Sequence, residues 1–182
     1  QYDYKGRYLL SGVLRRDSST RFGPRNRVAY FPSVTGGWIL SDEPFYGESK
    51  TLNFVKLRAS YGVLGSDLIG NSDNPYLGLL NGEGVYVFDG ELVQGAAVGV
   101  LPNPDLRWEQ ARKFDVGLDL RLIDDKLELN ADYFIDRRED LIISDIPISG
   151  IIGTYGPGGR NPAVNAGGVD NRGLELALTY TD

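Results

Sequence analysis

The stretch KFDVGLDLRL, residues 113–122, decides the fold, because apolar and polar side chains alternate along its whole length. Its even positions carry Phe, Val, Leu, Leu and Leu, whereas its odd positions carry Lys, Asp, Gly, Asp and Arg. Successive side chains of a β-strand point to opposite faces of the sheet. The stretch therefore predicts a strand with one apolar face and one polar face.

The same alternation recurs along the chain on both sides of this stretch. It is clear in residues 55–63, 127–133 and 173–180, and less regular in residues 8–14 and 30–40. Connections of two kinds separate these runs: short ones at residues 41–45 and 123–126, and long ones at residues 17–26, 65–107 and 142–171. Because neighbouring runs are expected to pair antiparallel, the short connections fall at one end and the long ones at the other. We expect about six up-and-down strands, and one helical turn capped by Ser41 in the first short connection.

Composition excludes several classes of protein. The chain has no Cys and no His, so it has neither a thiolate metal site nor the commonest general base. Its net charge of −6 argues against nucleic-acid binding, which needs a clustered basic face. No apolar run reaches the ~18 residues of a membrane-spanning helix, but a transmembrane β-strand needs only about 9–11 residues with one apolar face.

Alternation of this kind fits two architectures. In a soluble β-sandwich the apolar face packs on a second sheet. In a transmembrane β-barrel it faces lipid, aromatic residues gather near the strand ends, and the opposite face borders a hydrated lumen. The barrel is favoured by the aromatic residues, by the mixed charges of the polar face and by the unequal connections. We expect these residues to face lipid: Trp38, Leu57, Tyr61, Phe114, Leu118, Leu120, Tyr133, Leu176 and Tyr180. We expect these to face the lumen: Lys56, Arg58, Asp115, Asp119, Arg121, Glu128 and Asp132.

Several segments resemble motifs of one protein family, the SusC/RagA-type TonB-linked outer-membrane proteins of Bacteroidetes. The matching segments are RRDSSTRFG (15–23), YFPSVTGGW (30–38), LRASYG (57–62), LPNPDLRWE (101–109) and VDNRGLE (169–175). They follow the family order and cover most of the chain. Ser18 departs from the pattern, because the family usually has Gly there, and the interiors of the two longest loops match no motif.

The resemblance implies an all-β fold, a fragment of an antiparallel up-and-down transmembrane β-barrel in the bacterial outer membrane, with long extracellular loops. It also implies import of large nutrients (oligosaccharides or peptides), a SusD-like lipoprotein partner, and energy from a TonB–ExbB–ExbD complex. Transporters of this kind have about 22 strands and a plugged lumen. We therefore expect residues 1–182 to be part of one barrel domain, with the plug, the TonB-contacting segment and the remaining strands outside the chain. The alternative is a soluble β-sandwich module that binds carbohydrate.

Other candidate sites have simpler explanations. Residues 47–51 lack the glycine spacing of a phosphate-binding loop. The carboxylate pair at 124–125 lies in a turn and the pair at 139–140 at the loop end of a strand, and solvated charge explains both, so we expect no enzyme and no cofactor. Four residues could offer oxygen ligands to Ca²⁺, although a polar loop explains them better: Asp67, Asn71, Asp73 and Asn74. Loop aromatics could stack on a ligand, and the candidates are Tyr76, Tyr86, Phe88 and Tyr155.

Overall fold

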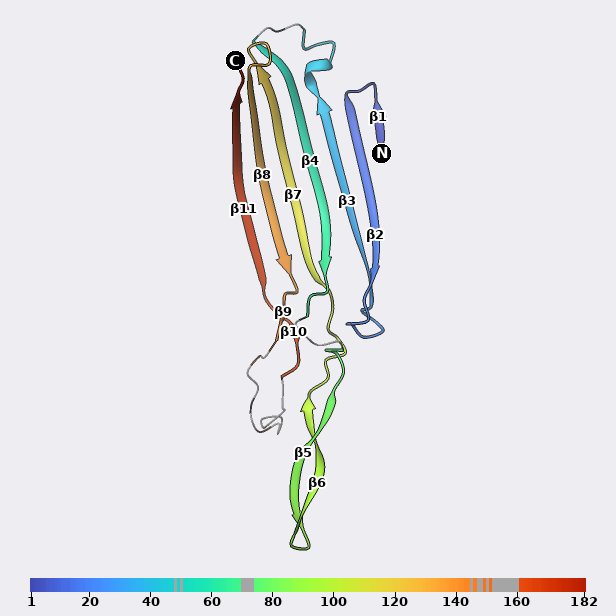
Figure 1. Ribbon diagram of the computed structural model, residues 1–182. Coiled ribbons are helices and arrows are strands. Elements are labelled where there is room, and N and C mark those ends of the chain that lie inside the picture. The colour runs from blue at the N-terminus through green and yellow to red at the C-terminus, as the bar shows by residue number, and fades with distance from the viewer. Residues whose placement is uncertain are drawn as a thin grey trace.

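The computed structural model describes residues 1–47, 49, 51–69, 74–144, 146, 149, 151 and 161–182. Its main body is one seven-stranded antiparallel sheet in the order β1-β2-β3-β4-β7-β8-β11, and two further strand pairs, β5–β6 and β9–β10, extend from one end of it (Figure 1). The elements are β1 (Tyr2–Tyr4), β2 (Tyr8–Ser18), β3 (Val28–Ile39), the 3₁₀ turn η1 (Leu40–Asp42), β4 (Leu52–Ser66), β5 (Leu79–Phe88), β6 (Glu91–Val100), β7 (Glu109–Leu122), β8 (Leu127–Glu139), β9 (Ile142–Ile143), β10 (Val164–Asn165) and β11 (Gly168–Tyr180).

The predicted all-β, up-and-down arrangement is confirmed. Each expected run of alternation lies in a strand of the main sheet, apart from Leu40, which begins η1. Each strand pairs antiparallel with its neighbours. The strands are longer than the runs that predicted them, with 15 residues in β4 and 14 in β7. Strands of this length exceed the usual five to six residues of globular proteins.

The connections differ between the two ends of the sheet. At one end lie the β1–β2 turn, the β3–β4 connection with η1, and the β7–β8 turn (Figure 1). In the β7–β8 turn Ile123, Asp124 and Asp125 all have positive φ, and the Lys126 N–H donates to the Ile123 carbonyl at 3.2 Å. The opposite end carries the β2–β3 loop and both extra strand pairs. We call these the short-turn end and the long-loop end.

Two local expectations were wrong. Ser41 does not cap a helical turn, because it lies inside η1; the residue before η1 is Ile39, and no side chain caps the turn. The stretch 65–107, expected to be one long loop, is not a loop throughout, because its first two residues belong to β4 and it contains the β5–β6 hairpin. Asp89 and Gly90 form its turn with φ of 51° and 82°, the left-handed conformations that a two-residue hairpin loop requires.

The register aligns like residues in rows across the main sheet. Leu57 lies opposite Leu118, Leu118 opposite Ala131, and Ala131 opposite Leu176. The neighbouring row, on the other face, runs from Arg58 through Gly117 and Asp132. We call these the apolar face and the charged face. The packed β-sandwich alternative requires a second sheet over the apolar face, yet the described residues form a single layer there, and the Leu176 side chain is 67% exposed.

Candidate functional site

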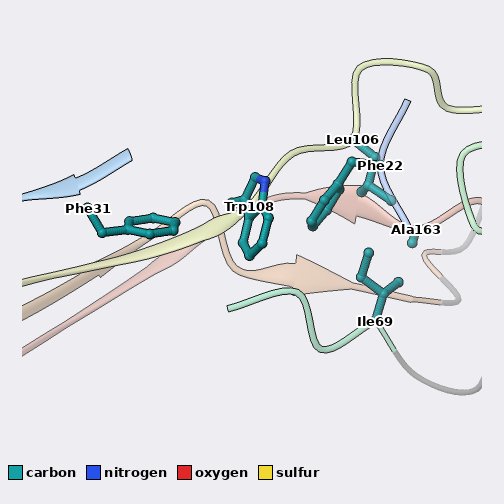
Figure 2. Close-up of a cluster of buried hydrophobic side chains, with 6 residues drawn as sticks. All are labelled: Phe22, Phe31, Ile69, Leu106, Trp108 and Ala163. Atoms are coloured by element: carbon teal, nitrogen blue, oxygen red, sulfur yellow. The ribbon is translucent and has the colours of Figure 1, made fainter. Parts of the chain in front are cut away.

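A cluster of buried apolar side chains lies at the long-loop end, which we call the loop-foot core (Figure 2). Trp108 is central to it, with its ring centroid 5.1 Å from that of Phe22 and 5.6 Å from that of Phe31. The members come from β3 and from four separate loop segments: Phe22, Phe31, Ile69, Leu106, Trp108 and Ala163. Among the described residues, this is where large apolar side chains become fully buried.

Hydrogen bonds from Asn and Trp side chains tie the loops together around the loop-foot core. The Trp108 indole N–H donates to the Asn26 carbonyl at 3.0 Å, and the Asn26 amide donates to the carbonyls of Asp105 and Leu106 at 3.1 Å each. The Asn103 amide donates to the Ala163 carbonyl at 2.7 Å. These side-chain hydrogen bonds thus join three loops at their bases.

An ion pair extends this network toward the β8–β11 connection. Arg107 donates through Nε and Nη2 to the two carboxylate oxygens of Asp140, at 3.0 and 2.6 Å. The Asn165 amide donates to the carbonyls of both residues at 2.8 Å. The hydrogen bond and positive charge of Arg107 hold the pKa of Asp140 below its usual value. Because the pairing is bidentate, it fixes direction as well as distance.

A second cluster lies on the charged face, in the middle of the sheet. The Arg58 guanidinium lies 2.9 Å from Asp119, 2.8 Å from Asp132 and 4.0 Å from Asp115. Gly117 makes this arrangement possible: a Cβ there would lie 2.6 Å from Arg58 Cζ and closer still to an Asp132 oxygen. The Arg58 side chain therefore crosses β7 over a residue without a side chain to reach β8.

The register places the residues predicted to face lipid and those predicted to face the lumen on opposite faces of the sheet. All residues predicted to face lipid lie on the apolar face, and all those predicted to face the lumen lie on the charged face. At the short-turn end the Tyr8 and Trp38 rings stack with centroids 6.2 Å apart.

The loop aromatics predicted to bind ligand are not brought together. Tyr76 packs against the loop-foot core. Tyr86 and Phe88 are exposed on β5, two positions apart on one face of the β5–β6 hairpin. Tyr155 lies outside the described residues, as do the Ca²⁺ candidates Asn71 and Asp73. In the part of the chain that the structure describes, no group of three acidic side chains is placed to hold a metal ion.

Sequence reasoning did not find the loop-foot core, although one signal was present. A Trp and a Leu stand in a stretch that is otherwise rich in Pro, Asn and charge, residues 101–109. Large apolar residues in such a stretch indicate a buried anchor and not a solvated loop. The partners of that anchor lie about 80 positions away, as the 82-residue separation of Trp108 from Asn26 shows.

Comparison with known proteins gives a consistent set of relatives. The family model "TonB dependent receptor-like, beta-barrel" matches residues 1–181. The chain is 33% identical to TonB-dependent receptor P3 of Formosa agariphila over 97% of its own length and 17% of that protein. It is 28% identical to TonB-dependent receptor SusC of Bacteroides thetaiotaomicron over 97% of its length and, again, 17% of the relative.

Solved structures agree with these relatives. The RagAB peptide importer in its "open-open" state matches 97% of this chain and 18% of the importer chain, with 30% sequence identity and a TM-score of 0.79. The chain thus spans about a sixth of the length of the relatives it matches. Among the residues that the structure describes, no helix is long and apolar enough to cross a membrane.

Proposed function

Because the chain belongs to the TonB-dependent receptor-like β-barrel family, we propose that it forms part of the wall of an outer-membrane transporter that imports large nutrients. Its place in the bacterial outer membrane follows from the family, whose SusC and RagA members are outer-membrane barrels. The relatives are receptors and transporters and not enzymes. We also propose the class of cargo, the partner proteins and the rest of the barrel wall.

The uncovered apolar face carries this proposal. On β7 it runs without a charged residue from Phe114 to Leu122, and on β8 from Leu127 to Ile135. Nine residues fall within the about 9–11 that a tilted transmembrane β-strand needs to cross the apolar band of an outer-membrane barrel. A sheet of this kind in water would expose far more contiguous apolar surface than soluble proteins tolerate.

The charged face then borders the lumen. Three carboxylates hold the Arg58 side chain in place, so this part of the lumen wall would be rigid and hydrated. We propose that a plug fills the space inside, and that the other strands of the barrel, which has 22 in transporters of this kind, come from parts of the protein outside residues 1–182. The chain's 17% share of its relatives' length supports this division.

The loops at the long-loop end shape the entrance. The loop-foot core holds their bases, so that the ends remain free to meet cargo and a SusD-like lipoprotein on the cell surface. We propose oligosaccharides or peptides as cargo and a TonB–ExbB–ExbD complex as the energy source, acting through segments outside this chain. The exposed rings of Tyr86 and Phe88 are the side chains of this chain that we assign to cargo binding.

Growth on single nutrients tests the transport proposal. A strain lacking the whole gene should lose growth on one class of oligosaccharide or peptide, and the intact gene should restore it. Restoration by a gene carrying Tyr86→Ala and Phe88→Ala should be partial, whereas Phe45→Ala, an equally exposed aromatic at the short-turn end, should restore growth fully. Unchanged growth of the deletion strain on every oligosaccharide and peptide, with the protein found in the soluble fraction, would refute transport.

A further inference from the structure

The apolar face ends at the long-loop end in a group of arginines on three neighbouring strands. These are Arg112 on β7, Arg137 on β8 and Arg172 on β11. Their positions have the same parity as the apolar residues of the same strand, so they lie on the apolar face and not on the charged face. The short-turn end of the same face has aromatic and aliphatic residues instead: Tyr8, Trp38, Leu122, Leu127 and Tyr180.

Of the three arginines, Arg172 lies nearest the middle of the sheet, at the edge of the apolar rows. It is opposite Ile135, which is opposite Phe114, which in turn is opposite Tyr61. Arg172 is therefore the charged member of a row that is otherwise apolar. Its side chain is exposed and has no ion pair with any residue that the structure describes.

The other two arginines are only partly neutralised. Arg112 lies directly opposite Arg137, an arrangement of like charges that destabilises a sheet unless an anion lies nearby. Arg112 pairs with Glu139 at 3.2 Å and Arg137 with Asp170 at 3.0 Å. The arginine side chains nevertheless remain 48% and 53% exposed, so their remaining donors point to the surroundings. Three guanidinium groups thus share two carboxylates.

We propose that Arg112, Arg137 and Arg172 bind the phosphate group of a lipid in the outer leaflet of the membrane. This rests on the proposed function, in which the apolar face meets lipid and the long loops lie outside the cell. An arginine at the edge of the apolar band extends its head toward the polar boundary, where lipid phosphates lie. Guanidinium groups bind phosphate through paired hydrogen bonds, and the apolar rows below would contact the acyl chains of the same lipid.

Lipid retention by the whole transporter tests the proposal. The protein is purified in mild detergent and exposed to a phosphorylated glycolipid or to the same glycolipid without phosphate, and bound copies are counted by native mass spectrometry. The wild-type protein should prefer the phosphorylated form by about tenfold or more, the factor expected from one charge-assisted hydrogen bond. This comparison needs no variant, and equal retention of the two lipids would overturn the proposal.

Matched variants locate the site. Arg137→Gln with Arg172→Gln should abolish the preference, whereas Lys5→Gln with Lys126→Gln, which removes the same charge at the short-turn end, should leave it intact. A preference that survives the arginine pair, or falls equally in both pairs, would refute the assignment. If the preference survives in arginine variants that still fractionate with the outer membrane and support growth, the lipid site is refuted while transport stands. A wild-type protein that does not reach the outer membrane would instead refute the proposed function.

Discussion

Leu176 and Ala177 are adjacent on β11 but lie on opposite faces of the sheet, so the same substitution at each reports the medium on each face. Leu176 continues the row of Leu118 and Ala131 on the apolar face. Ala177 lies opposite Asn130, in the row of Asp119 on the charged face. We expect Leu176→Arg to destabilise the whole transporter strongly and Ala177→Arg to change its stability little.

The magnitude follows from the exposure of Leu176. With 67% of that side chain exposed, its contacts within the sheet account for only about a third of the ~1.5–3 kcal/mol that full burial of a leucine contributes. If water met this face, Leu176→Arg would therefore cost roughly 0.5–1 kcal/mol. If the midplane of the bilayer meets it, the cost rises to about 2–4 kcal/mol. If water meets the charged face, Ala177→Arg should change the free energy of unfolding by about 0.5 kcal/mol or less.

The assay is denaturant unfolding of the full-length protein in phospholipid vesicles, with both variants and the wild type measured under one set of conditions. A difference of about 2 kcal/mol between the variants corresponds to a factor of about 30 in the equilibrium between folded and unfolded protein. Equal changes at the two positions, or a larger loss at Ala177, would show that lipid does not meet the apolar face.

Three further outcomes follow from the packing and the ion pairs. Gly117→Val places a side chain in the space of a guanidinium and should cost about 1–3 kcal/mol in unfolding experiments, whereas Gly12→Val, where a Cβ meets nothing within 4 Å, should cost less. Trp108→Ala removes the centre of the loop-foot core and should cost about 3–5 kcal/mol, seen as earlier protease cleavage in the loops it anchors and not in the strands. Arg107 lowers the pKa of Asp140, so the stability contributed by the Arg107–Asp140 ion pair is fully present above the unfolded-state pKa of about 4 and is lost as pH falls through the lower folded-state pKa. Amide hydrogen exchange in the loops should rise over that pH range, and Asp140→Asn should abolish the rise.

Strands β4, β7, β8 and β11 of the main sheet could be predicted because their side chains alternate clearly, whereas the alternation is weaker in β2 and β3 and no such run marks the three-residue β1. A slip of one residue would move every apolar side chain to the wrong face, so a pattern such as residues 113–122 fixes the register as well as the strand. The β5–β6 hairpin was missed for the opposite reason. Its sequence, LLNGEGVYVF before Asp89 and Gly90, has no clean alternation, so the Asp-Gly pair is the main local signal for a hairpin there.

The loop-foot core could not be predicted, because its contacts join segments that no local pattern relates. Asn26 binds the carbonyl of Leu106 across 80 residues, and Trp108 packs on Phe22 and Phe31. Propensity and periodicity act over a few residues, whereas these contacts depend on the sheet bringing loop bases to one end. Only after β2, β3, β4 and β7 are in register do these side chains meet.

The cluster around Arg58 bears on which medium meets the charged face. Three carboxylates surround one guanidinium, so the cluster carries an excess of negative charge. Inside a dry core, each ion without full compensation would cost several kcal/mol, far more than one ion pair returns. In a hydrated space the excess is screened, and the cost falls to the level of a surface ion pair, about 1 kcal/mol or less. The cluster therefore fits a face that meets water. The uncovered rows of leucine on the other face support our proposal that lipid meets that side.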